Sequence, residues 1–183
     1  NHLAAGNLMG EVRIWELATS KEVARISTPN FTGWGIIKGH YYTGGIYSLA
    51  FSPDDSEIFL AGMGTTRDPA AGNGKQLWER WSWREGEPKN KGSAHDGEIG
   101  QGLMESLAIH PEGRIFAMAG RLFKGDWNVA SFDRETGSRL AHTNCNMRVS
   151  KALWSEDGSH LYLAGGKSQP SNRKDIENPD CCL

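Results

Sequence analysis

One pattern occurs three times in this chain and limits what it can fold into more than any other feature. It runs from Ile46 to Gly62, from Met104 to Gly120 and from Val149 to Gly165. Each copy has an apolar run, a polar turn, a second apolar run and an Ala-Gly pair. The turns carry Pro, Asp and Gly, which favour a tight reversal between two short strands. Each copy therefore predicts a β-hairpin.

The first apolar run of each copy is apolar on both faces. In the first copy Leu49 and Phe51 point to one side of an extended strand, and Ala50 between them is apolar as well. A strand with two apolar faces is covered on both sides. We therefore expect each sheet to be packed between two others.

A second hairpin accompanies the repeated one. Residues 1–6 match the tail of the repeat, with Gly6 at the position of Gly62, and residues 10–23 then form a further strand pair. Residues 126–140 are the counterpart of that pair further along. The copies start at residues 46, 104 and 149, which gives spacings of 58 and 45 residues. Four antiparallel strands per unit with a period near 40 to 45 residues indicate the blades of a β-propeller, and the extra residues then belong to longer connections.

The expected class is all-β, and the expected architecture is an incomplete β-propeller with about three to three and a half four-stranded blades. We expect the partial propeller to span residues 1–166 and an irregular tail to span 167–183. The expected units are the end of one blade at 1–27, a second blade at 46–92, a third at 104–144 and the first hairpin of a fourth at 149–166. Propellers close with about four to eight blades, so we expect a fragment of a longer chain whose true N-terminus is missing.

The residues in excess of one blade fall in three connections, Ser27–Gly45, Met63–Gly74 and Lys91–Gly102. In a four-stranded meander these connections emerge at one end, opposite the short hairpin turns. Loops on a rigid scaffold usually carry recognition, so we expect this end to bind other proteins. Aromatic and arginine side chains are enriched at interface hot spots. The candidate contact residues are Trp34, Tyr41, Tyr42, Arg67, Asp68, His95, Asp96, Arg121, Phe123 and Lys124.

The repeated hairpins, the segment from residue 10 to 23 and the Gly39-His40 dipeptide resemble the WD-repeat β-propeller family. The resemblance covers about residues 1–166. It implies a non-catalytic interaction scaffold, with a buried hydrogen-bonded network in each repeat. The residues that match the His, Asp and Trp of that network are His40, His95, His142, Asp126, Trp15 and Trp83. Alanines stand where the network has a hydroxyl, so no unit holds the whole network, and we expect the blades to be joined mainly by apolar packing.

Composition argues against several other functions. With 20 basic and 22 acidic residues the net charge is only −2, which argues against nucleic-acid binding. No apolar run is long enough to span a membrane. The three cysteines, Cys145, Cys181 and Cys182, fit neither a disulfide framework nor a haem motif. The repeat accounts for three of the histidines, so we expect no metal or cofactor.

The remaining motifs also favour a structural interpretation. The run LWERWSWRE predicts Trp81 and Trp83 on one strand face and Trp78 on the other, as in packing between blades. Asp54 and Asp55 are interpreted as solvated turn residues rather than an acid-base pair. The glycine-rich segment from residue 65 to 75 lacks the spacing of a phosphate-binding loop.

An enzyme remains the alternative hypothesis. Residues 132–140 are similar to a quinoprotein repeat, which suggests a quinoprotein-like dehydrogenase, or a propeller fused to a catalytic or haem-bearing domain outside this chain. Those repeats usually have Trp soon after the Thr-Gly turn, where this chain has Leu140 and Ala141. We therefore expect no catalysis by this chain. The sequence favours a cytoplasmic location, and secretion stays open because the N-terminus is expected to be missing.

Overall fold

The computed structural model describes residues 1–31, 34–37, 40–43, 45–64, 76–96, 102–122 and 126–166. Within these ranges the regular structure is β-strand, apart from one turn of 3-10 helix, η1 (Pro29–Phe31). The prediction of an all-β chain is confirmed. Nowhere in the described ranges is there a helix with the length and apolar character needed to cross a membrane.

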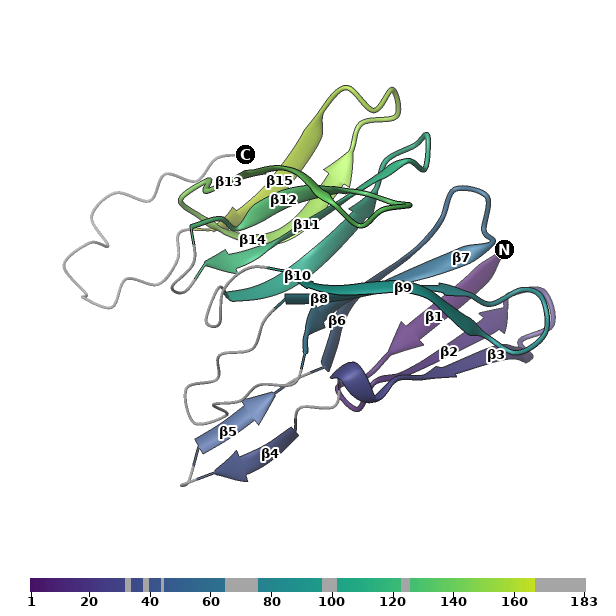
Figure 1. Cartoon of the computed structure of the whole chain (residues 1–183). Coiled ribbons are helices and arrows are strands. Elements are labelled where there is room, and N and C mark those ends of the chain that lie inside the picture. Colours follow the sequence, from purple (N-terminus) through teal and green to yellow (C-terminus); the bar gives the residue numbers. More distant parts are fainter. Residues whose placement is uncertain are drawn as a thin grey trace.

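The strands form antiparallel sheets whose order follows the sequence (Figure 1). The first sheet contains β1 (His2–Gly6), β2 (Glu11–Glu16) and β3 (Glu22–Ser27). The second sheet contains β6 (Gly45–Phe51), β7 (Glu57–Met63), β8 (Gln76–Ser82) and β9 (Lys89–Asp96). The third sheet contains β10 (Gly102–Ile109), β11 (Ile115–Leu122), β12 (Val129–Asp133) and β13 (Arg139–Thr143). The last hairpin pairs β14 (Arg148–Trp154) with β15 (Leu161–Gly166), and the projecting hairpin pairs β4 (Trp34–Ile37) with β5 (His40–Thr43).

These sheets lie face to face in chain order. β10 contacts β6 and β7 of the second sheet, and β14 contacts β10 and β11 of the third. The projecting hairpin stands apart from this stack, at one end of the strands (Figure 1). The division into a partial propeller over 1–166 and a tail over 167–183 stays a prediction, and the tail lies outside the described residues.

Irregularities in the pairing recur at equivalent positions and confirm that the three hairpin copies are equivalent. The register shifts directly after Ile46, Met104 and Val149, the first residue of each copy. A β-bulge of this kind twists a strand and re-aims its side chains. The first two strands of the second sheet, the third sheet and the last hairpin therefore have the same local geometry.

A second bulge corrects one assignment made from the sequence. The register with the last strand of each sheet, β3, β9 or β13, shifts directly before Trp15, Trp81 and Phe132, respectively. Trp81, and not Trp83, therefore has the same position as Trp15. Trp83 lies beyond the end of β8 at Ser82. The sequence could not separate the two tryptophans because they are two residues apart and face the same side of the strand.

The alignment of Gly6 with Gly62 is wrong by one residue. Gly6 faces the second sheet, because a methyl group placed on it would lie 3.0 Å from Cγ2 of Ile46. The residue that faces the next sheet in the same way from β7 is Ala61, which belongs to the core between the second and third sheets. Gly6 therefore corresponds to Ala61. An Ala-Gly pair alone does not define which of its residues points to which face.

The turn inside each repeated hairpin is closed by the same bonds. The N–H groups of Ser52, His110 and Ser155 donate to carbonyl oxygens five residues further on, at 2.9, 2.8 and 2.9 Å. In the first turn the Asp54 carboxylate accepts from the hydroxyls of Ser52 and Ser56. These hydrogen bonds lower the pKa of Asp54 to about 2. The turn residues thus satisfy one another, as the Pro, Asp and Gly pattern predicts.

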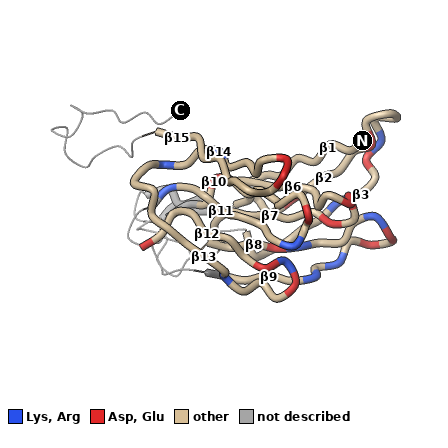
Figure 2. The backbone as a smooth tube through the Cα atoms, turned by 90° about the horizontal axis from the view of Figure 1, so that it is seen from above, with Lys and Arg blue, Asp and Glu red and all other residues tan. Residues whose placement is uncertain are grey.

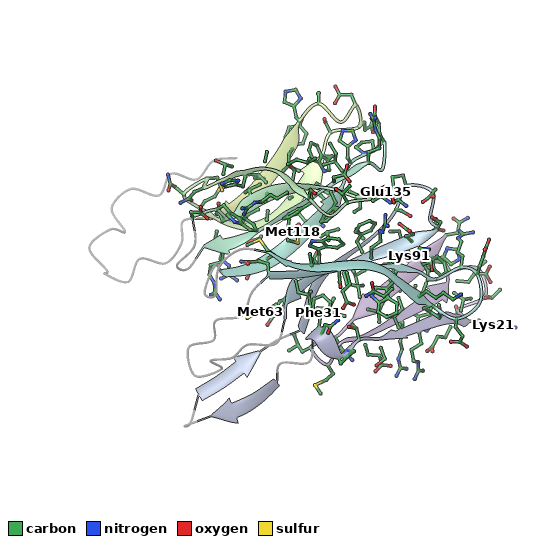
Figure 3. All side chains as sticks on the ribbon, viewed as in Figure 1. Lys21, Phe31, Met63, Lys91, Met118 and Glu135 are labelled. Atoms are coloured by element: carbon green, nitrogen blue, oxygen red, sulfur yellow. The ribbon has the colours of Figure 1, made fainter. Side chains whose placement is uncertain are left out.

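Apolar clusters fill the spaces between the sheets. Phe59 and Trp78 of the second sheet pack with Phe116, Phe132 and Met118 of the third. Figure 3 labels Met118 within this part of the stack. On its other face the second sheet places Trp83 and Leu77 against Val12 of the first sheet. Neighbouring positions along β8 thus face opposite sheets, as the alternation of the tryptophans predicts. Each described four-stranded sheet is covered on both faces.

Serine hydroxyls add a repeated polar link between neighbouring sheets. The N–H of Leu107 donates to the Ser48 hydroxyl at 2.8 Å, and the N–H of Ala152 donates to the Ser106 hydroxyl at 2.9 Å. Both serines directly follow the first bulge of their sheet. Lys151 has the same position in the last hairpin. Neighbouring units are therefore joined by these serine hydrogen bonds in addition to the predicted apolar packing.

One connection predicted from the sequence is partly a strand. The segment Lys91–Gly102 was expected to be a long connection, with the second blade ending at residue 92, but β9 continues to Asp96. The register pairs His95 with Leu77 and Asp96 with Gln76. An outermost strand is held by backbone bonds to one neighbour and does not need apolar side chains. The polar sequence at the end of β9 therefore gave no signal for a strand.

Gly137 offers a test of the packing between the second and third sheets. It has a φ of 71°, and a methyl group there would lie 2.6 Å from Cζ2 of Trp78. Gly86 is a matched control, with a φ of 68° and nothing within 4 Å. We expect Gly86→Ala to lower the free energy of unfolding by about 1 kcal/mol and Gly137→Ala by about 3 kcal/mol. Equal losses in urea denaturation would contradict the close packing of Trp78.

Candidate functional site

The strand directions give the molecule two different ends. At the loop end β3, β7, β9, β11 and β13 finish, and the two long connections, from β3 to β6 and from β7 to β8, leave from there (Figure 1). At the turn end the short turns join β2 to β3, β6 to β7, β8 to β9, β10 to β11, β12 to β13 and β14 to β15. The projecting hairpin belongs to the connection from β3 to β6, which starts and finishes at the loop end.

The candidate contact residues that the structure describes lie on strands at the loop end. Trp34 is the first residue of β4 and pairs with Thr43, and Tyr41 and Tyr42 are in β5. His95 and Asp96 are the last two residues of β9. Arg121 is next to the last residue of β11 and is exposed. The remaining candidates, Arg67, Asp68, Phe123 and Lys124, lie outside the described residues.

The residues matched to the network of the WD-repeat family are spread over different environments. His40 is in β5, His95 in β9 and His142 in β13, so each lies within a strand rather than before one. Asp126 is exposed, and Trp15 is half-buried on β2. Trp83 is buried between the first and second sheets. The buried hydrogen bonds at the loop end come instead from two other residues, Asn128 and Glu79.

Asn128 joins two connections at the loop end. It is fully buried directly before β12, and its Nδ2 donates to the carbonyl oxygen of Met147 at 2.5 Å. Its Oδ1 accepts from the N–H of Cys145 at 3.0 Å. One side chain thereby fixes the start of β12 to the connection between β13 and β14. Sequence reasoning missed Asn128 because it selected Asp126, two positions earlier, as the polar residue.

Glu79 fixes the start of the connection that carries the projecting hairpin. It is fully buried in the middle of β8. Its Oε1 accepts from the Thr28 hydroxyl at 3.0 Å and from Nδ2 of Asn30 at 2.6 Å. Its Oε2 accepts from Nε1 of Trp81 at 2.7 Å. A signal for this role was present in the sequence, because Glu79 interrupts an apolar strand face between Leu77 and Trp81.

The turn end carries polar contacts between the first and second sheets. Asp55 accepts from Nδ1 of His2 at 2.9 Å and pairs with Arg84. Partial burial alone raises the pKa of Asp55, but the hydrogen bonds from Arg84 and His2 outweigh it and hold that pKa below its usual value. Asp55 is therefore more than a solvated turn residue. An open pocket of about 380 Å³ lies beside this cluster, lined by His2, Val23, Trp83, Arg84 and Glu85.

A network of ion pairs joins the second and third sheets at the same end. Nη2 of Arg134 lies 2.6 Å from Oε2 of Glu57, and its Nε donates to the same oxygen at 3.1 Å. Arg80 pairs with Glu135 at 2.8 Å. The hydrogen bond from Arg80 lowers the pKa of the Glu135 carboxyl. The positive guanidinium groups thus bridge two sheets that the apolar core already holds together.

Along the described parts of the backbone the two signs of charge alternate. Lys and Arg are interspersed with Asp and Glu along the tube (Figure 2). Within the described ranges no group of three or more His, Cys, Asp or Glu residues could hold a metal ion. The buried polar residues described above are used to connect strands and sheets.

The pair between Glu57 and Arg134 can be tested against an exposed pair. The side chains of Glu57 and Arg134 are only 12% and 17% exposed, whereas those of Glu112 and Arg114 are 60% and 81% exposed. We expect Glu57→Gln to lower the free energy of unfolding by about 2 kcal/mol, because the largely buried Arg134 loses its closest ion pair and keeps only the more distant Glu135 at 3.8 Å. Glu112→Gln should change it by less than about 0.5 kcal/mol. Similar effects of both variants in denaturant titrations would show that the buried pair does not join the sheets.

Comparison with known proteins supports the fold and no specific family. No protein-family model matches the chain, and no curated protein matches its sequence. Among solved structures, the β-propeller domain of Cps50 (Swd1) from Myceliophteria thermophila superposes with a TM-score of 0.59 at 12% sequence identity. The match covers 90% of this chain and 44% of that domain, so the chain spans less than half the length of its structural neighbour. The chain has the fold of a partial β-propeller.

Proposed function

We propose that this chain is part of a non-catalytic scaffold of the WD-repeat type that binds other proteins through its loop end. The observation that carries the proposal is the contrast between the two ends of the strands. At the turn end the connections are short and closed by their own hydrogen bonds. At the loop end the two long connections, from β3 to β6 and from β7 to β8, leave the sheets, and the buried side chain of Glu79 holds the start of the first of them. Asn128 fixes the shorter connection from β13 to β14 beside them. Variable segments on a rigid base are typical of recognition surfaces.

The chemistry of the candidate contacts favours a protein partner. Trp34, Tyr41 and Tyr42 are aromatic, and Arg121 adds an exposed guanidinium group. Such side chains dominate the binding energy of protein interfaces. The interspersed charges do not favour nucleic acid, whose binding relies on a continuous basic surface (Figure 2).

The proposal predicts that Trp34→Ala with Tyr42→Ala abolishes capture of partner proteins from a lysate. Aromatic hot spots carry most of the binding energy, so the double variant should retain less than about a tenth of each specific partner. Quantitative mass spectrometry of the captured proteins, compared with wild type, provides the measurement. Leu17→Ala is the control, because Leu17 is an exposed apolar residue at the turn end. Equal capture by the double variant and the control would reject the loop end as the binding surface.

We further propose that additional blades of a longer chain cover the outer faces of this stack. Leu153 and Tyr162 are paired across the last hairpin and are 55% and 62% exposed on the face turned away from the third sheet. Leu3 is exposed on the opposite face, on β1. An exposed apolar pair such as Leu153 and Tyr162 fits an interaction site. The outer face of the first sheet is mixed, because it also carries the ion pairs of Arg13 with Glu11 and of Arg25 with Glu22. The 44% coverage of the structural neighbour agrees with further blades.

Hydroxyl-radical footprinting tests this second proposal. The 183-residue chain is compared with a longer chain that includes the residues encoded on either side of it. We expect the oxidation rate of Tyr162 to fall at least about fivefold in the longer chain, because burial between sheets excludes the radical. Leu17 at the turn end should react equally in both chains. Unchanged oxidation of Tyr162 would mean that no blade covers this face.

A further inference from the structure

Glu79 is an unusual residue for its place in the fold. It lies in the second sheet on the face that packs against the first sheet, where Leu77 and Trp83 are buried. A carboxyl group in such a place costs free energy unless both oxygens are hydrogen-bonded. Here three donors satisfy them, from Thr28, Asn30 and Trp81. An apolar side chain could pack at this position without any hydrogen-bond donors. The presence of Glu79 is therefore better explained by the specific hydrogen bonds that its carboxyl group accepts.

Two of the three donors belong to one short segment. Thr28 and Asn30 lie between the end of β3 and the end of η1, and Thr28 itself is buried. Phe31, the last residue of η1, is fully buried in the core between the first and second sheets. Figure 3 shows Phe31 where η1 meets the strands. The polar contact of Glu79 and the apolar contact of Phe31 thus hold the same segment against the second sheet.

This segment sets where the projecting hairpin begins. β4 starts at Trp34, three positions after Phe31. A chain advances at most about 3.6 Å per residue, so the backbone of Trp34 lies within about 11 Å of Phe31. The connection returns to the second sheet at Gly45, the first residue of β6. The hairpin is therefore attached to the second sheet at both of its ends.

We propose that Glu79 is a positioning residue that fixes the β4–β5 hairpin on the loop end. Its carboxyl group ties the segment from Thr28 to Phe31 to the central part of the sheet, so the hairpin starts from one defined place. A binding surface gains affinity when its elements are held in the bound arrangement beforehand. The consequence for partner binding rests on the function proposed above, whereas the positioning of the hairpin does not.

Four variants separate positioning from general stability. Glu79→Gln keeps the size of the side chain but replaces one acceptor oxygen by a donor, which then faces the donor groups of the segment or of Trp81. Asn30→Asp places a second carboxylate 2.6 Å from Glu79. The combination of Glu79→Gln with Asn30→Asp exchanges the amide and the acid, so the contact between the two side chains can form again. Asn30→Ala is a milder variant that removes one donor and keeps the carboxyl group.

Hydrogen exchange measured by mass spectrometry provides the main readout. We expect amides of residues 34–43 to exchange at least about tenfold faster in Glu79→Gln and Asn30→Asp, since a lost hydrogen bond to a carboxylate changes local opening by that factor or more. Amides of β11 in the third sheet should exchange as in wild type. The double variant Glu79→Gln with Asn30→Asp should restore slow hydrogen exchange, and Asn30→Ala should have an intermediate effect. Ser106→Ala is the matched control, because it removes a buried link between the third sheet and the last hairpin.

The outcomes decide the proposal in both directions. The proposal is supported if hydrogen exchange is faster only in the hairpin and if the double variant Glu79→Gln with Asn30→Asp restores the slow rate. Unchanged exchange of residues 34–43, or an equal increase in β11, overturns it, because Glu79 would then contribute only to overall stability. Capture of partner proteins is measured on the same variants and should fall with the loss of positioning. If the Trp34 and Tyr42 double variant captures partners normally, the proposed function fails, while the exchange result still decides the role of Glu79.

Discussion

The structure depends on the packing of sheets that are apolar on both faces. The second sheet places Phe59 and Trp78 against the third sheet and Leu60 and Leu77 against the first. Burial of large apolar side chains is the main favourable term in folding, and here it operates between sheets rather than within them. Because neighbouring sheets stack in chain order with the same antiparallel strand order, their connections gather at two ends, the loop end and the turn end.

The polar contacts specify an arrangement that apolar packing alone leaves open. Two apolar sheet faces could slide past each other with little change in buried area. Ion pairs at the turn end, such as that between Glu57 and Arg134, and the serine links form only when particular positions of two sheets lie side by side. They occur at defined points along the strands, so they fix the relative height of neighbouring sheets. The residues that set the relative position of the sheets thus differ from those that supply most of the stability.

Much of the fold was predictable from the sequence because its signals are local. The three hairpins, their turns and the opposite facing of Trp78 and Trp81 follow from short patterns of apolar and turn residues. The outer part of β9 was not predictable, because an edge strand can be polar on both faces. The assignment of Trp83 instead of Trp81 failed for a related reason. Trp81 and Trp83 face the same side of the strand, and the bulge that marks the equivalent position is visible only in the pairing.

The candidate site was predictable only in part. The sequence identifies aromatic residues in the long connections, but it does not show what supports them. Glu79 meets Thr28 and Asn30 across separations of 51 and 49 residues, and Asn128 meets Met147 across 19. Such pairs require the fold before they can be recognised. A polar residue in a strand is otherwise interpreted as a residue that faces solvent.

The serine links also have a mechanical consequence. Each sheet contacts mainly its neighbours in the chain, so tension applied between the two termini passes through the junctions one after another. In such a series the weakest junction yields first. The link from Ser106 holds the last hairpin, but Lys151 stands where that hairpin would need a serine to hold a further blade in the same way. In the longer chain proposed above, the junction at Lys151 would therefore open under load before the junctions joined by Ser48 and Ser106.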